Sequence, residues 1–373
     1  VMRKWLAECR VSQFDDGKIA NISPKNNNPS FFSGLLAGSV GWGDACIIVP
    51  YEMYRRYGDA RILSENYEMM KKWYVFLEER AKKRPVNPVK RFKRNPYRRY
   101  TIETGVDYGE WCEPDVESTS AMRTPQGKVA TAFFAYSGRM LAEIAAILGK
   151  EDDAAYYSKT AEMAKKAWRF IATKDGKISS DRQADYVRAL AFGLLDGDEA
   201  RQAAADLNEL VKKCGYHLNT GFLSTPNLTR VLCDYGYEDT AYKLLLQDTR
   251  PGWLYEVKKG ATTIWETWDG INEKGEVKAS LNHYSYGAIC GWILDAVCGI
   301  QVSDGKIRIC PHPDKVLGYA KASYQSPYGR IESGWKYDGD KVTYEFEIPS
   351  NTHAEVILPD GRREVLDSGR YSL

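Results

Sequence analysis

The feature that most constrains the fold is a pair of long segments with helical hydrophobic periodicity, separated by a glycine. Apolar side chains recur every three or four positions over residues 133–148 and again over residues 157–171, and Gly149 lies between the two segments. This spacing gathers apolar residues on one face of an α-helix, and a short link favours an antiparallel pair. The pattern also occurs over residues 44–77, with Gly58 in the link. Helical hairpins are therefore predicted as the repeating unit of the fold.

Further helices are predicted along the chain, separated by turns and loops. The first residues, 1–10, resemble the last turns of a helix that ends at the Asp15-Asp-Gly17 turn. Five later segments have the same periodicity: 182–195, 199–213, 226–235, 239–248 and 284–298. Helices that alternate with turns, without intervening strands, argue against a βαβ fold.

From residue 300 onward the hydrophobic period changes to two. Val342, Tyr344, Phe346 and Ile348 alternate with polar residues, and residues 354–358 repeat the pattern. Such alternation is typical of strands with one buried face. We predict a mainly α chain with a C-terminal all-β domain, divided into a helical domain over 1–299 and a small antiparallel β domain over 300–373.

Composition excludes several classes of protein. The chain has 373 residues, is 43% hydrophobic and carries a net charge of +2, as expected for a soluble globular protein. It contains no apolar run of about 18 residues, so no membrane span is expected. Its eight cysteines include no CxxC pair and do not have the spacing of zinc ligands. We therefore expect no metal site, no cofactor and no disulfide framework.

Residues 82–99 carry nine lysines and arginines and no acid. Such a stretch can bind nucleic acid in principle. Three prolines interrupt it, and no other basic patch accompanies it, so a solvated loop is the favoured interpretation. We expect no nucleic-acid or membrane partner.

Two neighbouring stretches carry the chemistry, Gly260-Ala-Thr-Thr-Ile-Trp-Glu-Thr-Trp-Asp-Gly270 and Ser280-Leu-Asn-His-Tyr-Ser-Tyr-Gly287. Glu266 stands between two tryptophans, and His283 follows a loop. Aromatic faces cover the apolar side of a pyranose, while carboxylates and imidazoles serve its hydroxyls and move protons. The alternative is that both tryptophans are core residues and Glu266 is a surface charge. Local geometry cannot aim both Trp265 and Trp268 at one ligand.

These two stretches resemble the α-L-rhamnosidases of glycoside hydrolase family 78. Other segments resemble that family in the same order, namely Gly41-Trp-Gly-Asp-Ala45, Tyr108-Gly-Glu-Trp111, Leu218-Asn-Thr-Gly-Phe222, Pro251-Gly-Trp-Leu-Tyr255 and Ser326-Pro-Tyr-Gly329. Six segments in register are a far more specific signal than one. The resemblance implies a six-hairpin α/α toroid followed by a β-sandwich, and an inverting glycosidase as its activity.

The resemblance also implies roles for individual residues. Glu266 takes the position of the general base, and His283 that of the histidine that hydrogen-bonds rhamnose. Trp42 and Trp111 match the aromatic walls of the sugar pocket. Asp44 either binds a sugar hydroxyl or only caps its helix, and both alternatives stay open. Glu110 and Asp115, which flank Trp111, are either pocket acids or solvated loop acids.

One part of the family pattern is missing from this sequence. The family's general acid lies in an Asp-Glu-Arg-Leu-Gly-Trp segment before the Trp-Gly-Asp-Ala helix, and nothing in residues 1–40 resembles it. We expect that Val1 falls inside the toroid, after its first helices, and that this chain alone hydrolyses little or nothing. The alternative is a non-catalytic relative that binds carbohydrate or a partner. The expected ligand is a rhamnose-containing oligosaccharide, polysaccharide or plant glycoside, while the linkage, compartment and oligomeric state stay open.

Overall fold

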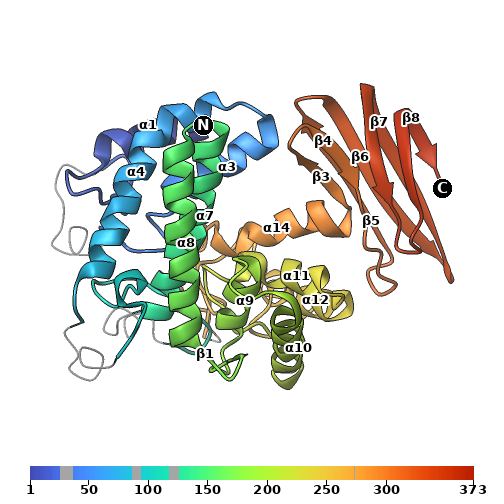
Figure 1. Ribbon diagram of the computed structural model, residues 1–373. Helices are drawn as coiled ribbons and strands as arrows, with labels where there is room; N and C mark the ends of the chain where they lie inside the picture. Colours follow the sequence, from blue (N-terminus) through green and yellow to red (C-terminus); the bar gives the residue numbers. More distant parts are fainter. Residues whose placement is uncertain (26–36, 86–93, 117–125, 273) are drawn as a thin grey trace. The chain divides into compact units, whose positions relative to one another are not determined.

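The computed structural model describes residues 1–25, 37–85, 94–116, 126–272 and 274–373 (Figure 1). Its elements are predominantly helical up to residue 297 and all strands from residue 300. The predicted mainly α chain with a C-terminal all-β part is confirmed. Tertiary contacts divide the chain into two compact units. The first unit comprises Val1–Tyr54, Asp59–Cys214 and Asn219–Asn227, and the second comprises Arg55–Gly58, Gly215–Leu218 and Leu228–Leu373.

The long helices predicted for the first part of the chain are present. They are α1 (Met2–Ser12), α3 (Ala45–Tyr57), α4 (Arg61–Lys82), α7 (Gly127–Ile147), α8 (Glu151–Ala172), α9 (Gln183–Ala191) and α10 (Gly197–Lys213). Pro50 lies inside α3 as expected. Smaller elements are the 3₁₀ turn η1 (Arg98–Tyr100) and a two-stranded hairpin of β1 (Thr173–Lys174) and β2 (Lys177–Ile178). Residues 86–93 and 117–125, which hold much of the predicted long connection and the middle of the basic stretch, lie outside the described residues.

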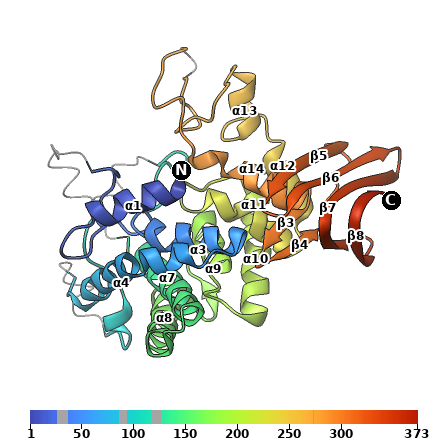
Figure 2. The same ribbon diagram turned by 90° about the horizontal axis from the view of Figure 1, so that it is seen from above.

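The core of the first unit joins three of these helices. Helices α7 and α8 form an antiparallel hairpin, seen side by side in Figures 1 and 2, and α4 packs against α7. Tyr74 of α4 is fully buried; its ring is 5.1 Å from that of Phe134 on α7 and 5.3 Å from that of Tyr157 on α8. Gly149 links the hairpin with a φ of +70°, a conformation that glycine adopts without strain.

The helices of the last third are shorter. They are α11 (Thr225–Asp234), α12 (Glu238–Leu245), α13 (Trp253–Lys258), the 3₁₀ turn η2 (Ser285–Ala288), α14 (Ile289–Trp292) and the π-helical turn η3 (Ile293–Val297). The single helix predicted over 284–298 is therefore a succession of 3₁₀, α and π turns. Helix α13 was not predicted, because six residues are too few to show a helical period.

The β part forms one six-stranded sheet that bends at its longest strand. The strands are β3 (Ile300–Ser303), β4 (Lys306–Ile309), β5 (Tyr319–Ser326), β6 (Gly329–Asp338), β7 (Lys341–Ile357) and β8 (Arg363–Ser372). The first half of β7 pairs with β6, and its second half pairs in parallel with β4. β7 also pairs antiparallel with β8, with a register shift between Ile348 and His353. β3 packs against β5 and β6, so the two halves face each other as in a sandwich. Inward-facing residues such as Trp335, Phe346 and Val356 are buried between them.

Candidate functional site

Three aromatic side chains of the first unit form a partly exposed cluster. The ring of Trp42 is 4.6 Å from that of Tyr108, and the ring of Tyr108 is 5.1 Å from that of Trp111 in an edge-on arrangement. All three residues are of intermediate exposure. The structure thus brings together two residues that were predicted as pocket walls, and it adds Tyr108 between them. The only signal for Tyr108 in the sequence is its place in the Tyr-Gly-Glu-Trp segment.

Tight packing around two glycines fixes the backbone that carries Trp42. Gly41 has a φ of +90°, and a Cβ atom there would lie 2.7 Å from Leu223. A Cβ atom on Gly43 would lie 2.3 Å from the buried ring of Trp73. Only glycine fits both positions, which explains why tryptophan is flanked by glycine in this segment.

Asp44 is fully buried, with 0% of its surface exposed. Its Oδ2 accepts the Gly41 N–H at 2.7 Å, and its Oδ1 accepts the Ser137 hydroxyl at 2.5 Å and the Trp73 Nε1–H at 3.2 Å. Burial raises the pKa of the Asp44 carboxyl, and these donors oppose the rise. Since protein donors occupy both oxygens, the geometry favours the structural alternative for Asp44, and its role in sugar binding stays a prediction.

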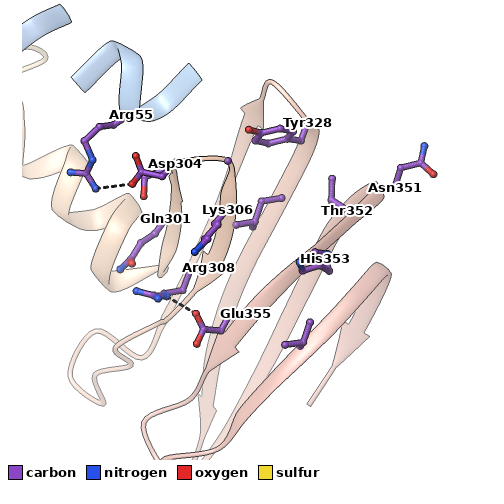
Figure 3. Close-up of a pocket in the computed structure, with 14 residues that line it drawn as sticks. Arg55, Gln301, Asp304, Lys306, Arg308, Tyr328, Asn351, Thr352, His353 and Glu355 are labelled. Carbon is purple, nitrogen blue, oxygen red and sulfur yellow. Dashed lines mark hydrogen bonds and ion pairs between the residues drawn. The ribbon is translucent and has the colours of Figure 1, made fainter. Parts of the chain in front are cut away.

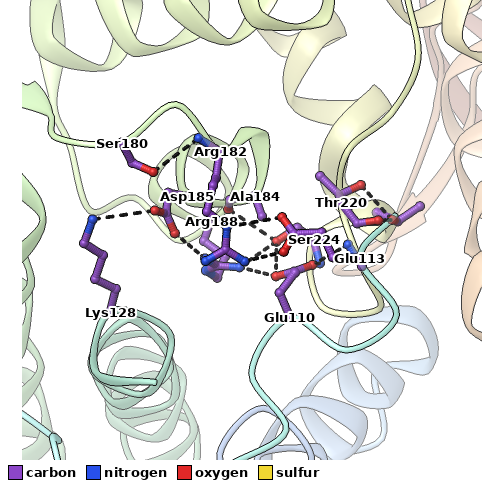
Figure 4. Close-up of polar contacts among 12 residues, drawn as sticks. Glu110, Glu113, Lys128, Ser180, Arg182, Ala184, Asp185, Arg188, Thr220 and Ser224 are labelled. Atoms are coloured by element: carbon purple, nitrogen blue, oxygen red, sulfur yellow. Dashed lines mark hydrogen bonds and ion pairs between the residues drawn. The ribbon is translucent and has the colours of Figure 1, made fainter. Parts of the chain in front are cut away.

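Glu110 belongs to a buried polar network (Figure 4). Its carboxylate pairs with Arg188, accepts the N–H groups of Gly221 and Ser224 at 2.9 Å each, and accepts the Ser224 hydroxyl at 2.8 Å. Arg188 in turn pairs with Asp185 at 2.5 Å. The prediction of a solvated loop acid is therefore wrong for Glu110, because the sequence could not show that an arginine 78 positions away is its partner. Its role as a pocket acid stays a prediction. Asp115 is exposed, as a loop acid would be.

This network holds the backbone of Trp111. The Phe222 N–H donates to the Trp111 carbonyl at 2.9 Å, and a Cβ atom on Gly221 would lie 2.2 Å from the same oxygen. Glu110 therefore holds the 221–224 turn through its hydrogen bonds. The same turn is hydrogen-bonded to the carbonyl of Trp111. The buried ion pair therefore helps to fix the backbone that carries Trp111.

In the second unit, the two stretches singled out in the sequence form an irregular hairpin. The Glu266 N–H donates to the Ser280 carbonyl at 2.9 Å, and the His283 N–H donates to the Ile264 carbonyl at 2.8 Å. An isolated bridge between Ile271 and Val277 closes the far end of the hairpin. Glu266 and His283 are thus carried by two paired strands of chain, as a shared site requires.

Glu266 and His283 are both of intermediate exposure. The Oε2 atom of Glu266 accepts the Ser280 N–H at 3.2 Å. The His283 Nδ1 atom accepts the Ser285 N–H at 3.4 Å, and the ring stacks on that of Tyr284. With its Nδ1 engaged as an acceptor, the histidine has its Nε2 protonated in the neutral form.

The two tryptophans beside Glu266 are core residues. Trp265 and Trp268 are each 2% exposed. The ring of Trp268 stacks on that of Tyr286 at 4.2 Å and meets that of Trp253 edge-on at 5.5 Å. The core interpretation therefore applies to both indoles, whereas Glu266 between them reaches the surface.

A cavity of about 720 Å³, lined mainly by polar residues, lies in the second unit (Figure 3). Its lining comes mainly from β3, β4 and β7 and includes the ion pairs Arg55–Asp304 and Arg308–Glu355, at 3.4 and 2.9 Å. None of the five predicted site residues lines this cavity.

Comparison with known families decides what kind of protein this is. Residues 1–297 match the family model of the bacterial alpha-L-rhamnosidase six-hairpin glycosidase domain, and residues 305–372 match that of the bacterial alpha-L-rhamnosidase C-terminal domain. The chain belongs to the bacterial α-L-rhamnosidase family. Its helical part is thus a six-hairpin glycosidase domain, as the resemblance implied, and the β part is the C-terminal domain of the same family.

Similar proteins support this assignment. An alpha-L-rhamnosidase of Formosa agariphila is 35% identical over 97% of this chain and 38% of its own length. The solved structure of Streptomyces avermitilis alpha-L-rhamnosidase complexed with L-rhamnose is similar with a TM-score of 0.84 and 31% identity, covering all of this chain and 36% of that one. Aspergillus terreus alpha-L-rhamnosidase gives a TM-score of 0.85 at 27% identity, covering all of this chain and 42% of that one. The chain thus spans a third to two fifths of the length of these rhamnosidases.

Two further observations concern the chain's other properties. None of the eight cysteines forms a disulfide. No helix in the described part of the chain is both long and apolar enough to cross a membrane.

Proposed function

We propose that this chain supplies the general base and part of the sugar pocket of an α-L-rhamnosidase that releases terminal α-linked L-rhamnose with inversion. The observation that carries the proposal is the placement of Glu266. A half-exposed carboxylate projects from a hairpin whose neighbouring side chains, Trp265 and Trp268, are locked in the core. General-base catalysis requires a carboxylate that a well-packed backbone holds in place at an accessible surface, and Glu266 meets this requirement.

In the proposed reaction Glu266 removes a proton from the attacking water. Ser280 donates to its Oε2 atom, and no hydrogen bond from the described residues occupies Oε1. The Oε1 atom is therefore the one proposed to accept the proton of water. In an inverting glycosidase the second carboxylic acid stands roughly 6.5–9.5 Å away to leave room for that water.

The sugar itself is proposed to meet aromatic and imidazole groups. Trp42, Tyr108 and Trp111 offer ring faces and edges to the apolar side of rhamnose, which includes its methyl group. His283 is proposed to hydrogen-bond a rhamnose hydroxyl with its Nε2–H. The similar Streptomyces avermitilis alpha-L-rhamnosidase was solved as a complex with L-rhamnose, which supports the choice of sugar.

No residue of this chain is assigned as the general acid. Without a proton donor the leaving oxygen departs as an alkoxide, and general acid catalysis typically contributes 10²–10⁴-fold in rate. We therefore expect residues 1–373 alone to bind rhamnose but to hydrolyse rhamnosides slowly or not at all.

The test is a proton NMR time course of p-nitrophenyl α-L-rhamnoside with the full-length protein. The appearance of β-rhamnose before its anomer supports inversion, and α-rhamnose first contradicts it. Glu266→Gln should lower kcat by orders of magnitude and leave rhamnose binding nearly unchanged. Glu276→Gln, an exposed acid of the same hairpin, is the matched control and should keep full activity. Binding without turnover in the unmodified protein would instead indicate a carbohydrate-binding relative.

A further inference from the structure

A second carboxylate, Glu256, lies beneath the hairpin that carries Glu266. Helix α13 is six residues long, and its only buried residues are Trp253 and Glu256, which are three positions apart and so share one face. That face lies against the hairpin: Trp253 contacts Trp268 edge-on and donates its Nε1–H to the Tyr286 carbonyl at 3.0 Å. Glu256 is 2% exposed, so its carboxyl lies in the same indole-lined interior.

The Glu256 carboxyl has an incomplete set of partners. Its Oε2 atom accepts the Trp265 N–H at 3.2 Å, and its Oε1 atom is buried with no hydrogen-bond partner among the described residues. Among the described residues, no lysine or arginine forms an ion pair with the Glu256 carboxylate. Buried carboxylates are rarely left in this state, because an unpaired acceptor costs free energy. Glutamine would make the same bond to Trp265 without a charge to bury.

The position of this one bond connects it to the proposed general base. Trp265 directly precedes Glu266 in the hairpin, and the backbone N–H groups of both residues are held. The Trp265 N–H donates to the Glu256 carboxylate, and the Glu266 N–H donates to the Ser280 carbonyl. The backbone that sets the direction of the Glu266 side chain is therefore held at two consecutive N–H groups, one by Glu256 and one by Ser280.

We propose that Glu256 is a positioning residue that fixes the Trp265–Glu266 backbone and thereby aims the general base. This inference rests on the proposed function of Glu266. An ionised acceptor makes a shorter and stronger bond to an N–H group than a neutral one. The clamp is therefore tighter when Glu256 carries its charge.

Glu256 changes its protonation state near neutral pH. Burial raises the pKa of its carboxyl to about 7, and the bond from Trp265 opposes the rise. Lys258 on its own helix pairs with Asp248. The titratable and charged side chains of the hairpin packed against it and of its own helix are Tyr255, Lys258, Glu266, Asp269, Lys274, Glu276, Lys278, His283, Tyr284 and Tyr286. The raised pKa of Glu256 has its cause in burial rather than in a neighbouring charge.

The test compares Glu256→Met, which removes the acceptor, with Glu256→Gln, which keeps it without the charge, in the full-length protein. Glu256→Met should lower kcat about tenfold or more with KM changed less than about threefold, since only the aim of Glu266 is lost. Glu256→Gln should recover most of that kcat. It should also lack the rise of kcat through pH 7 that the unmodified protein shows. Wild-type kcat in Glu256→Met, or an unchanged pH profile in Glu256→Gln, overturns the proposal.

Two further measurements test the proposal if a variant does not fold or has no activity. If Glu256→Met does not fold, the pH profile of Glu256→Gln decides alone. Tryptophan fluorescence followed against pH reads the titration without any activity, and the proposal expects a transition near pH 7 that Glu256→Gln lacks and Glu276→Gln keeps. Active Glu266→Gln would refute the proposed function, whereas inactive Glu266→Gln with fully active Glu256→Met refutes only the positioning role.

Discussion

The buried ion pair between Arg188 and Glu110 offers the sharpest test of how the aromatic cluster is held. Replacing Arg188 by Met keeps the length of the side chain and removes the charge. Two carboxylates, Glu110 and Asp185, then lose their main partner while almost wholly buried, with side-chain exposures of 0% and 5%. Asp185 then keeps the more distant Lys128, at 3.7 Å, and the hydrogen bond from the Ser180 hydroxyl.

The expected loss of stability is large. Removing one partner of a buried ion pair typically costs about 3–5 kcal/mol, because the remaining charge stays uncompensated. For a unit of this size that corresponds to a fall in Tm on the order of 10 °C. The control is Arg201→Met, whose ion pair with Asp198 has side-chain exposures of 68% and 95%. Exposed pairs contribute at most about 1 kcal/mol, so its Tm should hardly change.

The assay is thermal unfolding followed by circular dichroism near pH 7, supported by urea midpoints. A double substitution, Arg188→Met with Glu110→Gln, should be more stable than Arg188→Met alone, since the amide leaves no unpaired charge at that position. Equal Tm values for the Arg188→Met and Arg201→Met proteins would refute the reasoning. A double variant less stable than Arg188→Met would also refute it, because uncompensated charge could not then be the cause.

Three other predictions follow from the structure. Gly43→Ala should lower the free energy of unfolding by about 1–3 kcal/mol, because its Cβ atom would lie 2.3 Å from the buried Trp73 ring. The control is Gly291→Ala, whose Cβ atom would have no neighbour within 4 Å and which should cause no such loss. Urea unfolding midpoints of the two variants measure the difference. Tyr108→Leu should weaken the binding of L-rhamnose about two- to tenfold by calorimetry, as loss of an aromatic contact does, whereas the exposed Tyr319→Leu should have no effect. Because folding raises the pKa of Glu256 from 4.5 to about 7, its contribution to stability is fully present below pH 4.5 and is lost as pH rises through 7. The loss is roughly 3 kcal/mol at about 1.4 kcal/mol per pKa unit, so the Glu256→Gln protein should gain Tm over the unmodified protein between pH 5 and pH 8, and parallel curves would contradict this.

The helices that the sequence predicts are those long enough to show their period. Helices α4, α7 and α8 were predicted because 21 or 22 residues give several turns of apolar recurrence. Strand β7 was found because its inner residues alternate strictly with polar ones. The six residues of α13 and the mixed turns over 285–297 give no such signal, so their helical type follows from local packing.

The candidate site also has a part that the sequence predicts and a part that it does not. The order of short motifs along the chain identified the family and the residues to examine, including Glu266, His283, Trp42 and Trp111. Motif order carries no information on which partner a buried charge finds. Glu110 and Arg188 meet only because the fold brings distant segments together, as do Asp44, Trp73 and Ser137.

The class of fold, the family and the exposed chemistry thus follow from the chain's own order of residues, because periodicity and motif spacing are local properties. Which acids are structural and which reach the surface depends instead on tertiary contacts. Asp44, Glu110 and Glu256 are buried, while Glu266 is half exposed, although all four lie in polar, aromatic-rich segments of similar composition. The physical reason is that desolvation and hydrogen bonding depend on neighbours in space, and those neighbours come from elements far apart in the sequence.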